Sequence, residues 1–122
     1  MATLTITQKN KCDQHGADFL AAYDSDKLGL ALQTCEASGP WHGLRHLPEK
    51  GTSGWFIWKG DYKEGENFFS PLHVTHITDY APEVSEFLGL APGWRFLIDG
   101  TYNDVWLDES LLNIKTKQEA AS

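Results

Sequence analysis

Cysteine is scarce in this chain, with Cys12 and Cys35 as the only two among 122 residues. Their spacing matches no metal-binding pair, and the N-terminus lacks the basic segment and long apolar run of a secretory signal. We therefore expect two free thiols in a reducing compartment. No apolar run approaches the ~20 residues that a membrane helix needs, so the sequence predicts a cytoplasmic protein without a membrane partner.

Basic residues are also few, since ten Lys and Arg stand against 17 Asp and Glu, giving a formal net charge of −7. General binding to nucleic acid needs a clustered surplus of positive charge, so the composition argues against that class of partner. The imbalance is concentrated in residues 51–122, which hold five basic and eleven acidic side chains. Electrostatic recognition of a basic partner is therefore expected from the second half of the chain.

Catalytic signatures are missing as well. The segment Gly60–Gly65 lacks the Lys-Ser/Thr that completes a phosphate loop, and neither a Gly-x-Ser-x-Gly turn nor a His-Glu-x-x-His pair occurs. His73 and His76 share a face only if their segment is helical, and a metal site there would need further ligands. The sequence predicts no enzyme activity, no metal and no cofactor; the alternative is a small metal-dependent enzyme that uses His73 and His76.

Apolar residues are plentiful enough for one core, at 41% of the chain, with five Trp, six Phe and four Tyr. We predict a single α+β domain over residues 13–114, mainly an antiparallel sheet with an N-terminal helix and one short helix near residues 82–89. Residues 1–12 are expected to form a tail or a short strand, and residues 115–122 a disordered tail.

The expected elements follow from local patterns. Asp13 is placed to cap a helix over residues 13–23. Residues 28–35 and 41–47 alternate like the two strands of a hairpin, and the alternative for residues 28–35 is an extended helix. Residues 55–58 are apolar on both faces, which is typical of a central strand. Residues 94–108 predict a second hairpin, whereas residues 71–80 fit neither the helical nor the strand period.

Two acidic stretches are candidate partner-binding sites. One is the turn after the central strand, which contains Asp61, Glu64 and Glu66. The other is one side of the last strand, exposed if Val105 and Leu107 face the core; its members are Tyr102, Asp104, Trp106 and Asp108. Aromatic and acidic side chains side by side are typical of a surface that binds a basic protein. Packing of Trp106 into the core is the competing interpretation.

The order of the motifs resembles a known family. The runs Ser53-Gly54-Trp55-Phe56-x-Trp58-x-Gly60-Asp61, Asp79-Tyr80-x-Pro82-Glu83-Val84 and Gly93-Trp94-Arg95-Phe96 are similar to the bacterial immunity protein thirty-three-like family over about residues 30–98. The positions that match its recurring residues are Trp55, Gly60, Asp61, Pro82 and Trp94. Trp58 departs from the pattern, and the N-terminal helix and C-terminal hairpin extend past the matched region.

The resemblance implies an α+β domain without catalysis that neutralises a protein toxin made by the same bacterium or its kin. We therefore expect an immunity protein whose acidic and aromatic second half binds a basic toxin. A regulatory domain that holds a small ligand between its tryptophans is a further alternative.

Overall fold

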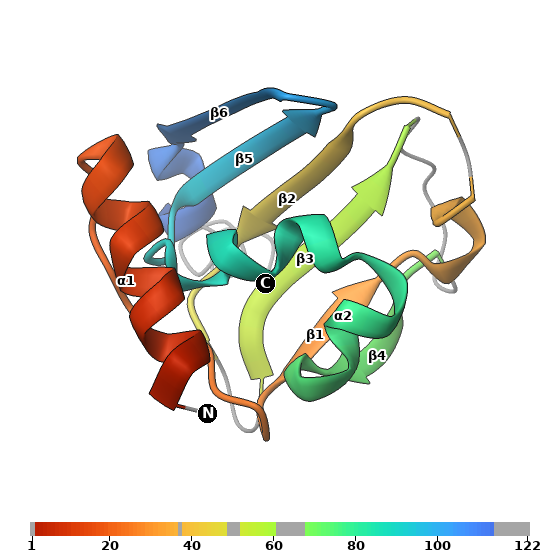
Figure 1. Ribbon diagram of the computed structural model, residues 1–122, viewed down its shortest axis with the longest axis horizontal. Helices are drawn as coiled ribbons and strands as arrows, with labels where there is room; N and C mark the ends of the chain where they lie inside the picture. The colour runs from red at the N-terminus through yellow and green to blue at the C-terminus, as the bar shows by residue number, and fades with distance from the viewer. Residues whose placement is uncertain (1, 37, 49–51, 61–67, 114–122) are drawn as a thin grey trace.

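The computed structural model describes residues 2–36, 38–48, 52–60 and 68–113, which form a six-stranded sheet and helical segments (Figure 1). The strands are β1 (Lys27–Leu30), β2 (Trp41–Arg45), β3 (Thr52–Lys59), β4 (Ser70–His73), β5 (Trp94–Asp99) and β6 (Tyr102–Leu107). The α-helices are α1 (Ala2–His15) and α2 (Ile77–Tyr80). The 3-10 helices are η1 (Leu32–Thr34), η2 (Val74–His76), η3 (Pro82–Gly89) and η4 (Glu109–Asn113). The mostly antiparallel sheet and the short helix at residues 82–89 confirm the predicted α+β class.

The strand order is β4-β1-β3-β2-β5-β6, so the apolar run within β3 lies in the interior of the sheet, as predicted. The expected hairpin between residues 28–35 and 41–47 is wrong, because β3 lies between β1 and β2 and pairs with β1 in parallel. The N–H of Ala31 donates to the carbonyl of Ile57 at 3.0 Å, which keeps the chain on β3 as it leaves β1. A strand that is apolar on both faces buries more surface between two neighbours than at an edge.

The N-terminal region is a helix, which corrects the expected tail or short strand over residues 1–12 and the expected helix over residues 13–23. Helix α1 ends at a Schellman motif, in which Gly16 adopts a φ of +63°. The N–H of Gly16 donates to the Asp13 carbonyl at 3.3 Å, and that of Ala17 to the Cys12 carbonyl at 2.9 Å. After Gly16 the chain is no longer helical, and Phe19 forms an isolated bridge with Leu90.

Tertiary contacts hold α1 in place. The fully buried Gln8 amide donates to the Ala22 carbonyl and accepts from the Ala22 N–H, each at 3.0 Å. The ammonium of Lys11 lies 5.1 Å from the ring centre of Phe87 and 3.5 Å from the Glu86 carboxylate. The β-branched Thr and Ile residues near the start of the chain are weak helix formers, so packing rather than propensity selects the helix.

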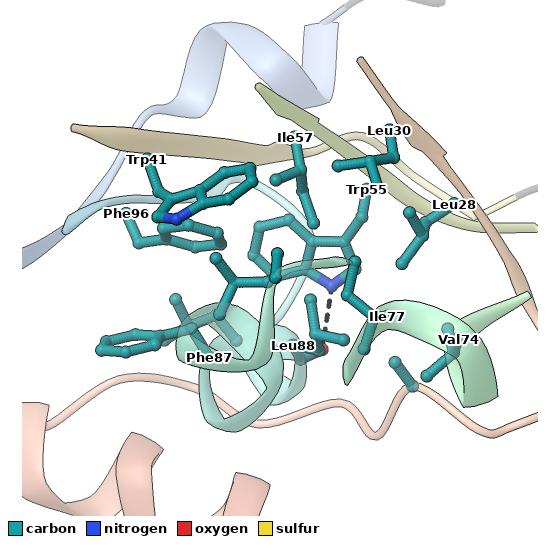
Figure 2. Close-up of a cluster of buried hydrophobic side chains, with 14 of the residues drawn as sticks. Leu28, Leu30, Trp41, Trp55, Ile57, Val74, Ile77, Phe87, Leu88 and Phe96 are labelled. Atoms are coloured by element: carbon teal, nitrogen blue, oxygen red, sulfur yellow. Dashed lines mark hydrogen bonds between the residues drawn. The ribbon is translucent and has the colours of Figure 1, made fainter. Parts of the chain in front are cut away.

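The main core lies between one face of the sheet and the segments α2 and η3, which cross that face in Figure 1. We call this the inner face; its side chains include Leu28, Leu30, Trp41, Trp55, Ile57 and Phe96, shown in Figure 2. The indole N–H of Trp55 donates to the Leu88 carbonyl at 2.9 Å, the dashed line in Figure 2. That bond fixes η3 on the sheet while the Trp55 ring remains buried.

Arg45 is buried in this region at 1% exposure. Its guanidinium lies 5.7 Å from the Trp55 ring centre and donates to backbone carbonyls at 2.6–3.5 Å. The accepting residues are Leu20, Ala21, Ser53, Leu88 and Leu90. Burial lowers the pKa of Arg45 to about 10, which still leaves the side chain charged at neutral pH. Carbonyl acceptors therefore replace the carboxylate partner that a buried cation otherwise needs.

The Ser53-Gly54-Trp55 motif builds an irregularity in β3. In the pairing of β1 with β3, Lys27 lies opposite Thr52 and Gly29 lies opposite Phe56. Two residues of β1 therefore span the same length as four residues of β3, so β3 bulges at this point. The Ser53 hydroxyl donates to the Lys27 carbonyl at 2.9 Å, and Gly54 adopts a φ of +92°. A Cβ at Gly54 would overlap the His46 carbonyl oxygen, so only glycine fits.

Residues 71–80, which fit neither period, contain both kinds of structure. Strand β4 runs to His73, and η2 and α2 follow directly. Val74 and Ile77 are buried at helical spacing, whereas the strand residues before them alternate in exposure. The period changes inside the segment, so a single pattern does not describe it.

Candidate functional surface

The face of the sheet opposite the inner face carries the predicted β6 residues, and we call it the outer face. Residues directly opposite each other in an antiparallel pair share a face. The pairs that share this face in β5 and β6 are Arg95↔Trp106, Leu97↔Asp104 and Asp99↔Tyr102. Val105 instead packs against the core cluster. Val105 and Trp106 therefore lie on opposite faces as expected, and Trp106 is not a core residue, whereas Leu107, which was expected to face the core, is 45% exposed.

The exposed members of this surface lie along the strand that ends the sheet. Tyr102 is 60% exposed and Trp106 36% exposed, and Asp104 between them is also exposed. The guanidinium carbon of Arg95 lies 5.6 Å from the Trp106 ring centre. Arg95 thus holds the indole over β5, because a cation over a ring face is attracted by its negative centre. The structure brings Tyr102, Asp104 and Trp106 onto one strand face.

Asp108, the fourth predicted residue of that strand, has a different role. Its carboxylate accepts from Arg95 at 3.2 Å, from the Ser110 hydroxyl at 2.6 Å and from the Ser110 N–H at 3.1 Å. The hydrogen bond from the Ser110 side chain lowers the pKa of Asp108 most, and the Arg95 contacts lower it further. Asp108 therefore anchors the start of η4 and has less freedom than Asp104 to bind a partner.

The other predicted patch, Asp61, Glu64 and Glu66, lies outside the described residues. The residue before it is placed: the Gly60 N–H donates to the Pro40 carbonyl at 2.8 Å beyond the end of β3. The turn between β5 and β6 is at the same end of the sheet, because Lys59 pairs with Trp41, Trp41 with Ile98, and Ile98 with Asn103. Three strand spacings of about 4.8 Å separate β3 from β6, roughly 14 Å.

The outer face also contains an aromatic row that the sequence did not assign to a site. His42 stacks on Trp58 with ring centres 5.1 Å apart, and Phe69 lies 6.1 Å from Trp58. Phe56 is 5.1 Å from Phe69 and 5.5 Å from the His46 ring. Burial, and secondarily the charge of Arg95, lowers the pKa of His42. The sequence contains a signal for this row, because Phe56 and Trp58 are two residues apart in a strand and so share the face opposite to Trp55 and Ile57.

A hollow of about 740 Å³ adjoins one end of this row. Its lining includes Phe56 and Phe69, and it is bordered by Lys27, His46 and Ser70. Apolar walls with a few polar groups at the rim are typical of sites that hold small ligands. The hollow lies near the β4 edge of the sheet, whereas β6 forms the other edge.

The two candidate metal ligands lie apart from this surface. His73 is exposed at the end of β4, and exposed His76 follows in η2 with its Nδ1 3.6 Å from the Asp79 carboxylate. Within the described ranges, no three His, Cys, Asp or Glu side chains group to form a metal site. Cys12 and Cys35 are free thiols, and burial raises the pKa of both, that of Cys12 to about 11. No helix among the described residues is long and apolar enough to cross a membrane.

The described positions that match the family pattern hold the fold together. Trp55 is in the core, Gly60 turns the chain at a φ of +77°, and Pro82 begins η3. Trp94 packs partly buried against the same core. These recurring residues are therefore scaffold, and the exposed residues of β6 fall outside the recurring pattern.

Comparisons with known proteins agree with the resemblance seen in the sequence. The curated proteins and the solved structures gave no significant match. A family model described as the Imm33-like domain matches residues 7–108, which span the chain from α1 through β6. Since the match covers most of the 122 residues, this chain belongs to the Imm33-like domain family.

Proposed function

We propose that the protein is a non-catalytic immunity protein, which binds a cognate bacterial toxin in the cytoplasm through the outer face at β6. Membership of the Imm33-like family supports the toxin partner. The observation that carries the choice of surface is the exposed row of Tyr102, Asp104 and Trp106. Tyr and Trp are frequent hot-spot residues, because they bury large rigid surfaces at low entropic cost.

Charge supports a basic toxin. Strands β5 and β6, helix η4 and Asp108, which links β6 to η4, contain four acidic side chains among their described residues. Arg95 is the one basic side chain in the same set. The acids are Asp99, Asp104, Asp108 and Glu109, and Asp108 is paired with Arg95. A negative surface on a chain of net charge −7 accelerates encounter with a positive partner and repels a second acidic protein. We infer that the acidic turn with Asp61, Glu64 and Glu66 extends this surface.

The test first looks beside the gene of this chain for a large secreted protein with a variable C-terminal domain, and takes that domain as the candidate toxin. Co-expression of this chain should restore growth of cells that produce the toxin domain. Asp104→Lys should slow association about tenfold at low salt, and the difference should shrink as salt rises, because long-range attraction is screened. The matched control is Glu83→Lys, which makes the same charge change at an exposed position in η3.

Failure to restore growth, or equal association rates of wild type and Asp104→Lys across the salt series, would count against the proposal. Loss of association in Glu83→Lys to the same extent would show that total charge matters rather than the β6 surface.

The hollow beside Phe56 and Phe69 favours a second candidate, a domain that binds a small ligand. A ligand there would raise the melting temperature of wild type, and Phe56→Ala should abolish that rise. A thermal-shift screen of small metabolites in which nothing stabilises the wild-type chain would remove support for this candidate.

A further inference from the structure

The two edges of the sheet differ in how they are protected. Strand β4 at one edge is four residues long and contains Pro71, two features that discourage pairing with another chain. Strand β6 at the other edge is six residues long, contains neither Pro nor Lys, and pairs with β5 over six consecutive positions without a bulge. Within the described part of the chain, no strand lies on its free side.

The hydrogen-bonding direction along β6 follows from its neighbours. The N–H of Asp108 donates to the Gly93 carbonyl at 2.7 Å, toward β5. In an antiparallel ladder, alternate residues direct both backbone groups to the same side. Asp104 and Trp106 therefore bond to β5, whereas Asn103, Val105 and Leu107 direct their N–H and C=O groups away from the sheet. Among the residues that the structure describes, none hydrogen-bonds to these outward backbone groups, and we call the three residues the outward half-ladder.

From this geometry we propose that β6 is a template for strand addition, and that the toxin binds by adding an extended segment as a seventh strand. The inference rests on the proposed function and specifies its binding mode. Backbone bonds to Asn103, Val105 and Leu107 supply affinity, and side chains of the added strand supply specificity.

The exposed side chains of β6 indicate which residue types the added segment should carry. A residue paired beside Asp104 lies between the exposed rings of Tyr102 and Trp106. Lys or Arg satisfies this position, because its charge pairs with the carboxylate and its stem packs against the two rings. On the opposite face, Leu107 is 45% exposed, so the residue beside it is apolar. The partner segment is therefore an amphipathic strand with a basic residue on one side.

A second copy of this chain fits the edge less well. Antiparallel self-pairing centred on Asp104 would place two carboxylates opposite each other, and each copy has a net charge of −7. Like charges directly opposite destabilise a strand pair, so a basic partner is favoured over a homodimer.

The experiment removes one outward N–H without touching the protein's own ladder. Asn103→Pro should keep the melting temperature of wild type, because proline is tolerated where the N–H faces solvent at an edge. Its Kd for the candidate toxin domain should rise at least tenfold. Asn103→Ala is the matched control, since it loses the same side chain but retains the N–H, and its Kd should stay within about threefold of wild type.

Amide hydrogen exchange on the wild-type complex gives a second readout that does not depend on the folding of a variant. The amides of Asn103, Val105 and Leu107 should slow at least tenfold on binding, whereas those of Asp104 and Trp106 should already exchange slowly in the free protein because they bond to β5. Docking through side chains alone would not produce this alternation.

The outcomes separate the two hypotheses. If wild type binds the toxin domain but Asn103→Pro binds equally well and no alternation appears, strand addition is overturned while the immunity function stands. If wild type does not bind, both fail. Concentration-dependent dimers of wild type, lost in Asn103→Pro, would assign the edge to a second copy and overturn the basic partner.

Discussion

Trp55 and Trp106 show two opposite uses of the same residue type. Trp55 in β3 is 1% exposed, and its indole N–H and ring are both occupied, by the Leu88 carbonyl and by Arg45. Trp106 in β6 is 36% exposed and contacts Arg95 from one side. The comparison shows that the recurring tryptophan of the motif stabilises the fold, whereas a tryptophan outside the motif is available for binding.

The largest expected effect breaks this comparison at its buried member. Trp55→Ala should lower the free energy of unfolding by about 3–5 kcal/mol, because it leaves a cavity in the core and removes the hydrogen bond from the indole N–H to the Leu88 carbonyl. Trp106→Ala should lower it by less than about 1 kcal/mol. Urea denaturation measures both values. Affinity for the toxin should instead depend mainly on Trp106. The Trp106→Ala variant should remain folded and bind the toxin roughly 30-fold more weakly than wild type, a loss typical of a hot-spot residue.

Gly54 in β3 and Gly100 in the β5–β6 turn allow the same comparison between core and edge for the backbone. Gly54→Ala should cost roughly 3 kcal/mol, because its φ of +92° is strained for alanine and the added Cβ overlaps the His46 carbonyl. Gly100→Ala, in the β5–β6 turn, has a φ of +61° and open space around it. It should cost about 1 kcal/mol. Equal losses in thermal denaturation would mean that the Ser53-Gly54-Trp55 irregularity is not a tight structural feature.

An effect smaller than those of Trp55→Ala and Gly54→Ala concerns pH and the buried Cys12 on the helix side of the sheet. Burial raises the pKa of this thiol from 9.0 in the unfolded chain to about 11, so the folded state retains the proton over that range. Unfolding then releases a proton, and stability should fall as the pH rises from 9 to 11, by on the order of 2 kcal/mol. Below pH 9 this contribution is fully present. Between pH 9 and pH 11, the Cys12→Ala variant should therefore lose on the order of 2 kcal/mol less unfolding free energy than wild type.

The sequence predicted those features that depend on local pattern. The two-faced apolar run Trp55–Trp58 placed β3 in the interior, and alternation in residues 94–108 gave the β5–β6 hairpin but left open whether Trp106 faces outward or into the core. Recurring residues such as Pro82 indicated the family. The binding roles of Asp104 and its neighbours remain predictions.

Features that depend on distant contacts were missed. Helix α1 is selected by the pairing of Gln8 with Ala22, which no local pattern shows. Gly16 is a visible stop signal, but the predicted helix over residues 13–23 runs through it. The aromatic row at His42, Phe56 and Phe69 forms only because β3 lies between β1 and β2.

The carbonyl bonds of Arg45 have a consequence for how the molecule opens. One side chain on β2 holds the segment at Leu20, the start of β3 at Ser53 and the end of η3 at Leu90. None of these segments separates from the others without exposing a buried cation or its acceptors, so they unfold as one cooperative unit. Arg45 donates no hydrogen bond to β6, so we expect the β6 edge to open independently of that unit.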